Sequence, residues 1–437
     1  MSHTSIPMTA LDEAFLNLGE NALMGIQLEV RVEGRLDGER LLAAMRTAVE
    51  RHPLTRARLG VTPFGGTQRD WAVSDDPDHL ALEVTDDAVG VVRERFYSVQ
   101  PDLASSPGFI AALVHDSGGD YLMLNLHHAL FDGMSATRLV TSIARAYGGE
   151  ADPLGGPGDL GQARDLRNMA GAQSLADIVP RAKELATSTL ARRQPMVRLA
   201  SDGGDASPGR AFAFATIGFD ADETAKLVAA KPIGSTLNDV VLAAQALTIR
   251  RWNAEHDGPP GGLISTMMPV NLRPAEWSTE VLSNLASYVA VMVESDALAD
   301  DLEGASRQMS QITGPLKRNG VAGWLVDLLE RPSLVPVFVR DAVRSLVPMV
   351  ESRFMETTAV SNLGRVTTPA FGEDGRVTEV WFSPPCFSAA GMHAVVGVAG
   401  VAGGLNLVVR TMREVVSAAG VSRYAEMLRE TLSGVPQ

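Results

Sequence analysis

Two adjacent histidines precede an aspartate–glycine pair in the run HHALFDG at residues 127–133, which lies between two apolar stretches of different period. Residues 121–126 have the length and composition of a buried strand, whereas residues 134–147 carry apolar side chains at helical spacing. The pattern therefore predicts that both histidines lie where a strand ends and a helix begins. We interpret this stretch as an active-site loop.

The chemistry of the loop centres on one imidazole. A histidine with an ordinary pKa of about 6.5 is mostly neutral near pH 7, so it can take a proton from an alcohol or amine that attacks a carbonyl. We expect His128 to be this general base. His127 shares the motif, but we expect it to be a core histidine that satisfies backbone groups. The chain has no G-x-S-x-G elbow near the motif, so we expect direct attack by an acceptor substrate.

The motif resembles the HHxxxDG signature of the chloramphenicol acetyltransferase-like superfamily. That superfamily includes nonribosomal peptide condensation domains, plant BAHD acyltransferases, polyketide-associated acyltransferases and wax ester synthase/diacylglycerol acyltransferases. The resemblance covers most of the chain and is nearest to the last two branches. Further similar stretches are the opening at 11–15, the first helix and strand at 41–59, the NDVVLA-like helix at 237–244, the PVNLRP-like segment at 268–274 and the SN-containing strand at 361–364.

The sequence pattern predicts an α/β fold, because helical patterns at 41–51 and 240–252 alternate with strand-like runs at 27–32, 109–114 and 288–293. The resemblance implies the finer architecture. It consists of two chloramphenicol acetyltransferase-like sandwich subdomains that form a V-shaped pseudo-dimer, with the HHxxxDG motif in the middle of a central tunnel.

The length of 437 residues predicts two or three domains, since a domain usually takes about 100–200 residues. The best boundary is the stretch 194–210, which is rich in Gly, Ser and Asp and has no apolar period. We expect an N-terminal subdomain at 1–193 that carries the motif, a linker at 194–210 and a C-terminal subdomain at 211–437.

The acidic residue of the motif has a structural interpretation. Asp132 stands where it can cap the helix that follows. The resemblance implies that this carboxylate points away from the substrate and pairs with an arginine, for which Arg273 is the best match. Gly133 either allows close backbone approach beside a thioester or simply allows the turn.

Two further polar pairs belong to the predicted site. Asn238 and Asp239 either cap the helix that begins there or support the active site. Ser361 and Asn362 could line the acceptor channel or donate hydrogen bonds to a developing oxyanion. The residue types alone leave these alternatives open.

Charge and composition exclude several functions. With a net charge of −14 and no long basic run, we expect no nucleic-acid partner. The N-terminus has no secretory signal pattern, and the apolar stretch 394–409 is short and broken by glycines, so it predicts two strands; we expect a cytoplasmic protein without a transmembrane segment. The one cysteine, Cys386, predicts a small buried residue, and the scattered histidines predict no metal site.

We therefore expect an acyltransferase that moves an acyl group from a CoA or phosphopantetheine thioester to a hydroxyl or amine, without an acyl-enzyme or a permanently bound cofactor. Its partners would be acyl-CoA or an acyl or peptidyl carrier protein and a small-molecule acceptor, and we expect a monomer. Two alternatives remain open: a stand-alone condensation domain that forms an amide or ester, and a catalytically silent module that recruits partners.

Overall fold

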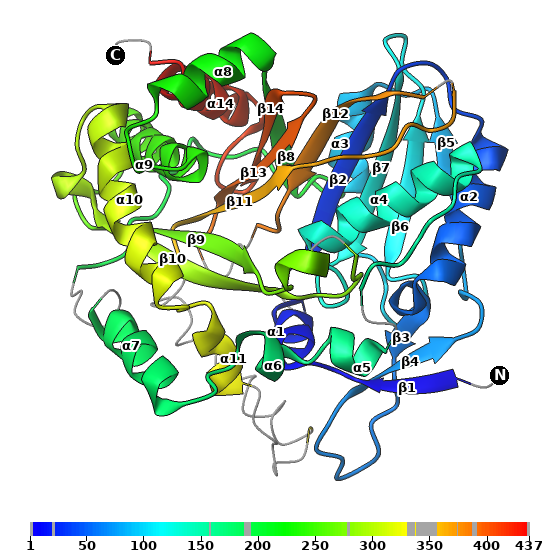
Figure 1. Cartoon of the computed structure of the whole chain (residues 1–437). Helices are drawn as coiled ribbons and strands as arrows, with labels where there is room; N and C mark the ends of the chain where they lie inside the picture. Colours follow the sequence, from blue (N-terminus) through cyan, green and yellow to red (C-terminus); the bar gives the residue numbers. More distant parts are fainter. Residues whose placement is uncertain are drawn as a thin grey trace.

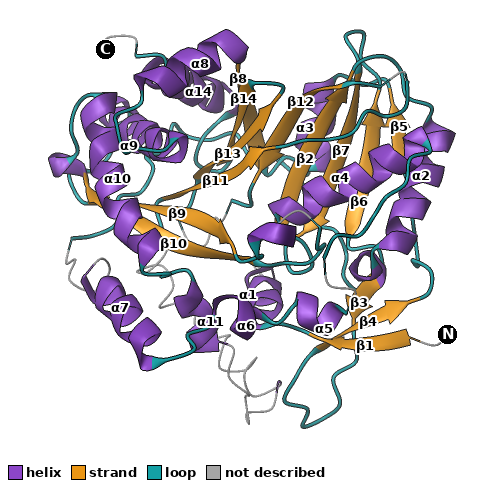
Figure 2. Ribbon diagram, viewed as in Figure 1, coloured by secondary structure: helices purple, strands orange, loops and turns teal. Residues whose placement is uncertain are grey.

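The computed structural model describes residues 3–19, 22–156, 159–187, 194–277, 280–329, 337, 356–373, 375–386 and 391–434. Two large β-sheets lie side by side, and most helices lie on their outer faces (Figures 1 and 2). This is the predicted α/β fold.

The first sheet has five strands in the order β12-β2-β7-β6-β5. Its central strand β7 is buried along almost its whole length, as expected for a strand covered on both faces. Helices α2 and α4 pack on one face, and α3 packs on the other. The bounds are β2 Gly25–Val32, α2 Gly38–Arg51, β5 Glu83–Thr85, α3 Val89–Phe96, β6 Phe109–Val114, β7 Asp120–His127, α4 Gly133–Gly148 and β12 Val377–Ser383.

The second sheet has six strands in the order β10-β9-β11-β13-β14-β8. Helices α8, α9, α10 and α14 cover its outer face in Figure 1, and α9 is buried nearly all round. The bounds are β8 Phe212–Phe219, α8 Ala221–Ala230, α9 Leu237–Glu255, β9 Leu263–Asn271, β10 Ala286–Glu294, α10 Leu302–Arg318, β11 Thr358–Arg365, β13 Ala394–Val401, β14 Gly404–Met412 and α14 Ala418–Leu432.

A small three-stranded sheet, in the order β1-β4-β3, lies beside the first half near the N-terminus (Figure 1). Helix α1 runs from β1 toward the junction of the two large sheets. The remaining bounds are β1 His3–Pro7, α1 Ala10–Gly19, η1 Pro53–Arg56, β3 Ala57–Leu59, β4 Asp70–Ser74, α5 Leu160–Ala163, α6 Leu166–Ala170, α7 Leu175–Leu185, η3 Ala275–Trp277, η4 Ser295–Ala297 and α11 Gly323–Leu329.

Strand β12 joins the two halves. It comes late in the chain, yet it pairs antiparallel with β2 of the first sheet, with Phe382 opposite Leu28. The division into 1–193, 194–210 and 211–437 stays a prediction. Strand β12 belongs by sequence to the predicted C-terminal subdomain, but it is a strand of the first sheet.

The segment predicted to be a linker makes backbone and side-chain contacts with the rest of the chain. Its residue Met196 forms a bridge with Leu263, and the Ala200 amide donates to Asn253 Oδ1 at 2.8 Å. Both partners belong to the second half of the chain, so this part of 194–210 packs against that half.

Two predictions about apolar segments are confirmed. Residues 394–409 fall in the two antiparallel strands β13 and β14, which turn at Gly403 with φ at 88°. The Cys386 side chain is buried. Among the described residues, no helix is both long and apolar enough to cross a bilayer.

Candidate active site

The HHxxxDG loop lies where the two halves of the molecule meet. Strand β7 ends at His127 and helix α4 begins at Gly133, as the sequence predicted. The His128 amide donates to the Met24 carbonyl at 2.9 Å, and Asn284 Nδ2 donates to the His128 carbonyl at 2.9 Å. Asn284 belongs to the loop between β9 and β10, so both halves hold the backbone of His128.

The His128 ring has a defined hydrogen-bonding state. Its Nδ1 lies 2.9 Å from the Phe131 carbonyl oxygen, which can only accept, so Nδ1 carries the proton. The lone pair is therefore on Nε2. The Phe15 ring from α1 stacks on the imidazole with centroids 3.8 Å apart and planes 18° apart. Burial lowers the pKa of His128 to about 4, although the Asp132 charge partly opposes this shift. The ring is neutral at pH 7.

His127 has a different role in the structure. Its Nδ1 accepts a hydrogen bond from the Ala129 amide at 3.1 Å, so this imidazole satisfies a backbone donor. Burial, together with the neighbouring His128, lowers the pKa of His127 to about 3. Both observations agree with the prediction of a core histidine.

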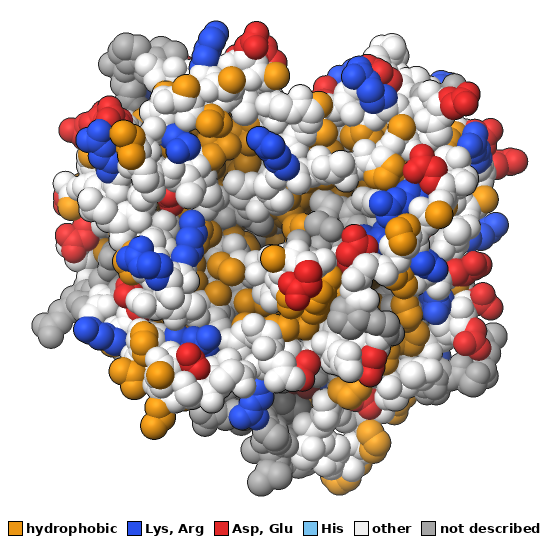
Figure 3. Space-filling model, viewed as in Figure 1, with side chains coloured by type: hydrophobic (Ala, Val, Ile, Leu, Met, Phe, Trp, Pro, Cys, Tyr) orange, Lys and Arg blue, Asp and Glu red, His pale blue; other side chains and the backbone are white. Residues whose placement is uncertain are grey.

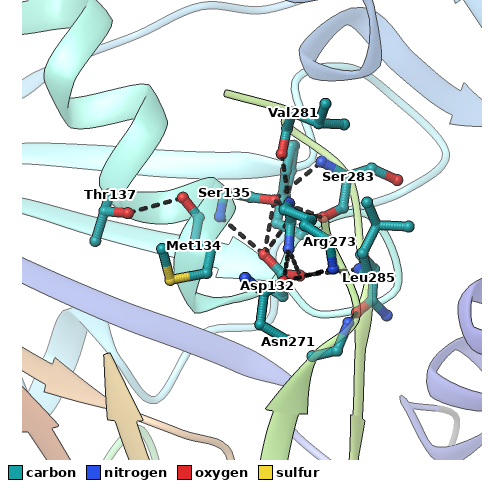
Figure 4. A network of polar contacts seen from close by, with 12 residues as sticks. Asp132, Met134, Ser135, Thr137, Asn271, Arg273, Val281, Ser283 and Leu285 are labelled. Carbon is teal, nitrogen blue, oxygen red and sulfur yellow. Dashed lines mark hydrogen bonds and ion pairs between the residues drawn. The ribbon is translucent and has the colours of Figure 1, made fainter. Parts of the chain in front are cut away.

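Asp132 and Arg273 form a buried ion pair across the two halves (Figure 4). Arg273 Nη1 donates to Asp132 Oδ2 at 2.6 Å, and Arg273 Nη2 donates to Asp132 Oδ1 at 3.0 Å. The carboxylate also accepts from the amides of Ser135 and Leu285 at 2.8 and 2.9 Å. The first of these is the predicted helix cap, and the arginine is the one that the resemblance implied.

Arg273 uses the rest of its guanidinium on backbone carbonyls and on the side-chain oxygens of Asn271 and Ser135. Its Nε donates to Val281 at 3.0 Å and its Nη2 donates to Ser283 at 2.6 Å. Burial alone raises the pKa of Asp132, but the Arg273 charge and the hydrogen bonds to the carboxylate outweigh it, so the pKa lies below its ordinary value. Asp132 is therefore ionised, and both of its carboxylate oxygens accept hydrogen bonds from groups of the protein.

Gly133 permits a close approach, but of protein side chains. A Cβ on this residue would lie 2.5 Å from Leu363 Cδ2 and 3.1 Å from the Phe382 ring. Gly133 is not among the glycines with positive φ, so the turn does not require it. The glycine thus lets the start of α4 lie against β11 and β12.

We expect Gly133→Ala to destabilise the fold by about 1–3 kcal/mol, because the added methyl group overpacks this contact. Urea unfolding monitored by circular dichroism measures the change. Adding Leu363→Ala should restore part of the loss. The matched control is Gly90→Ala in α3, where a Cβ meets nothing within 4 Å. Equal stability of Gly133→Ala and the wild type would contradict this reading of the contact.

The other predicted polar residues separate into two groups. Thr236 caps α9, and Asp239 completes the capping box and accepts from Thr313 Oγ1 at 2.7 Å. Asn362 Nδ2 donates to Asn238 Oδ1 at 3.3 Å, and Asn362 Oδ1 accepts from the Gly364 amide at 2.8 Å. Asp239 is thus structural, and the two asparagines face each other between α9 and β11.

Ser361 faces the opposite side of β11 from Asn362, since successive side chains of a strand alternate. Its neighbour Ala359, on the same side, packs in the apolar cluster that includes Met24. Of the predicted pair 361–362, Ser361 is therefore the residue that points toward the junction of the halves. The face seen in Figure 3 is hollowed between the two halves, with hydrophobic side chains in the depression.

Sequence reasoning missed the groups that hold the loop in place. Phe15, Met24 and Asn284 contact His128 directly, and Ser135 Oγ bridges Asp132 and the Ser283 backbone at 2.9 and 2.6 Å. Ser135 could have been found, because it is the third residue of a helix capped by an aspartate. In the part of the chain that the structure describes, no cluster of three or more His, Cys, Asp or Glu could hold a metal.

The chain belongs to the Condensation domain family, since the family model for the Condensation domain matches residues 17–293. An uncharacterised protein of Mycobacterium tuberculosis, Rv2305, is 46% identical over 429 residues, which cover 98% of this chain and 99% of that protein. Tyrocidine synthase 3 of Brevibacillus parabrevis is 35% identical over 127 residues, or 28% of this chain and 2% of the synthase.

Solved condensation domains share the whole fold. The first condensation domain of the calcium-dependent antibiotic synthetase, with a substrate analogue, has a TM-score of 0.72 at 15% identity and covers 99% of this chain and 97% of that one. The starter condensation domain of rhizomide synthetase, in complex with C8-CoA and Leu-SNAC, has a TM-score of 0.70 at 14% identity, with coverages of 99% and 94%. The fold is thus two chloramphenicol acetyltransferase-like halves, while the nearest branch stays a prediction.

Proposed function

We propose that this chain is an acyltransferase that moves an acyl group from a thioester to a hydroxyl or amine acceptor, with His128 as its general base. The observation that carries the proposal is the state of the imidazole. Its Nδ1 proton is held by the Phe131 carbonyl, so Nε2 has a free lone pair, and the ring is neutral at pH 7.

In the proposed reaction the acceptor attacks the thioester carbonyl while Nε2 of His128 takes the proton of the acceptor hydroxyl or amine. The new C–O or C–N bond forms, the C–S bond breaks, and the imidazolium returns the proton to the departing thiolate. The Asp132–Arg273 pair keeps the loop in place without touching the reacting atoms. Among the described residues, no serine hydroxyl hydrogen-bonds to His127 or His128, which supports transfer without an acyl-enzyme.

The donor is an acyl-CoA or an acyl group on a carrier protein. Membership of the Condensation family favours the carrier protein, because the matched relatives include tyrocidine synthase 3. One of the solved structures that share this fold contains C8-CoA, so acyl-CoA stays a candidate donor in the proposal. A free-standing condensation reaction that forms an amide or ester is therefore the second candidate.

The test combines product analysis and intact-mass spectrometry on the full chain. It uses a panel of acyl-CoA and acyl-carrier thioesters with mixed alcohol and amine acceptors, and the His128→Ala variant runs beside the wild type. We expect a product with the wild type, little with the variant, and no acylated protein. Consumption of no thioester in any combination would overturn the proposal and favour a recruitment module.

The activity of the proposed base should depend on pH in a specific way. Because burial lowers the pKa of His128 to about 4, kcat/KM is expected to stay flat from about pH 8 down to about pH 5.5 and to fall below that. Folding stability should fall in the same direction. The unfolded histidine gains its proton near pH 6.5 and the folded one only near 4, so stability is lost as pH drops from about 6.5 to about 4. Steady-state assays with circular dichroism at each pH check both; an acid limb centred at pH 6.5 would contradict the expectation.

A further inference from the structure

Arg410 differs from every other buried arginine of the described residues. Arg138, Arg164, Arg273 and Arg413 each form an ion pair with a carboxylate, at 2.9 Å for Arg138, 2.6 Å for Arg273 and 2.7 Å for Arg413. Arg410 has no exposed surface and no such partner. A buried charge without an opposite charge is costly, so its presence calls for a chemical reason.

The contacts of Arg410 use only part of its guanidinium. Nη1 donates to the carbonyls of Gly25 and Pro384 at 3.1 and 3.2 Å, and the guanidinium lies 3.7 Å from the centre of the Phe212 ring. Nε and Nη2 have no hydrogen-bond partner. Burial lowers the pKa of Arg410 to about 10, which still leaves it charged at pH 7. The charged guanidinium therefore has two donor nitrogens, Nε and Nη2, without a hydrogen-bond partner.

Among the residues that the structure describes, the groups around Arg410 do not supply a counter-charge. Glu29 accepts from Nε and Nη2 of Arg93, both at 2.7 Å, so this carboxylate is already neutralised. The Cys386 thiol donates to the Met392 carbonyl at 2.9 Å. The Tyr97 hydroxyl has no partner at hydrogen-bonding geometry. Burial, together with the neighbouring Glu29 carboxylate, raises its pKa well above the ordinary value and keeps it protonated.

Arg410 and His128 border the same apolar cluster. Arg410 lies on the face of β14 opposite Leu407 and Val409, which pack under α9 and α14, so it points toward the first half. Gly25, which it contacts, follows Met24, whose carbonyl holds the His128 amide.

The cluster between the two residues is made of adaptable side chains. Methionine and phenylalanine dominate it, and methionine fills irregular space with three rotatable bonds. Phe15, which stacks on His128, packs against this cluster, and Phe212, which stacks on Arg410, belongs to it. We call the following side chains of this cluster the Met/Phe cluster: Phe15, Met24, Phe212, Met267, Met392 and Met412.

We propose that Arg410 is the binding site for a carboxylate of the substrate, with Nε and Nη2 as the donors and the Tyr97 hydroxyl as a third donor. The proposal rests on the acyltransferase function and names its substrate class: the acyl chain or the acceptor carries a carboxylate, and its apolar part lies in the Met/Phe cluster. Such a ligand supplies the missing charge and takes up the free donors, as guanidinium–carboxylate pairs do.

Equilibrium binding tests the site without any turnover. Isothermal titration calorimetry of the full chain compares adipic acid monoamide with adipamide, as mimics of an acyl chain, and β-alanine with β-alaninamide, as mimics of an acceptor. In one of the two pairs the wild type should bind the carboxylate at least about tenfold more tightly than the amide. In Arg410→Met this preference should shrink to about twofold or less, while binding of the amide stays the same.

Two further variants keep the result interpretable. Tyr97→Phe removes only the hydroxyl and should reduce the carboxylate preference by about threefold or more, since one donor is lost. Arg376→Met removes a surface arginine that pairs with Glu33 and should leave the preference unchanged. The proposal is overturned if the wild type shows no preference for the carboxylate, or if folded Arg410→Met keeps that preference. Arg410 would then only stabilise the contact between the two halves.

Turnover identifies which substrate carries the group. Adipoyl and methyl adipoyl thioesters of N-acetylcysteamine are compared with neutral acceptors, and β-alanine and its amide are compared as acceptors for a neutral donor. A preference for the free acid that Arg410→Met abolishes assigns the carboxylate to that substrate. If no pair turns over, the acyltransferase proposal fails, and the binding experiment still decides on the carboxylate site.

Discussion

Replacing His128 by alanine is expected to lower kcat/KM for acyl transfer by about 10²–10⁴, the usual contribution of a positioned general base. The loss should fall on kcat, because the base acts in the transition state and contributes little to ground-state binding. The structure gives the reason for assigning the base to this ring: Nδ1 is held by the Phe131 carbonyl and the stacked Phe15 ring fixes its plane, so Nε2 has one direction in which to accept a proton.

The companion variant His128→Asn separates the base from the fold. The asparagine amide nitrogen can donate to the Phe131 carbonyl as Nδ1 does, but it offers no basic lone pair. Its melting temperature should match the wild type more closely than that of His128→Ala, while its activity should be equally low. His79→Ala removes an exposed histidine that lies outside the loop and should keep full activity. Wild-type rates in folded His128→Asn would rule out a general-base role.

The local structure of the motif was predictable because its determinants are close in sequence. An apolar strand pattern, a polar loop and a helical pattern follow one another within residues 120–148, and the structure has β7, the HHxxxDG loop and α4 in that order. The glycine-broken stretch 394–409 was resolved into two strands by the same short-range logic.

The contacts that assemble the site could not be predicted from spacing. Asp132 and Arg273 are 141 residues apart, and only a family resemblance suggested their pairing. Asn284 is 156 residues from His128 and lies in a loop without a motif. The return of β12 to the first sheet gives no local signal either, since an apolar strand does not reveal its partner. What the sequence lacks is the tertiary contact map, and those contacts fix the geometry of the base.

The second large effect concerns stability. Asp132→Ala is expected to destabilise the chain by about 3–5 kcal/mol, because it leaves the Arg273 charge buried without its partner and removes the acceptor of the Ser135 and Leu285 amides. Since the pair joins a loop of the first half to a loop of the second, the loss should also loosen the contact between the halves. Chemical denaturation followed by circular dichroism measures the first effect, and small-angle X-ray scattering measures the second.

A double-mutant comparison distinguishes the ion pair from a general sensitivity of this loop. Asp132→Leu combined with Arg273→Met removes both charges, so its cost should be clearly smaller than the sum of the two single changes. Glu33→Ala is the surface control, because the ion pair between Glu33 and Arg376 is exposed to solvent. This variant should unfold at the same denaturant concentration as the wild type. The pKa of Asp132 lies below its ordinary value, so the wild type should lose the contribution of the pair only at acidic pH, as the carboxylate becomes protonated. Additive losses in the double variant would mean that Asp132 acts as a helix cap alone, and the link between the halves would then have to come from Asn284 and β12.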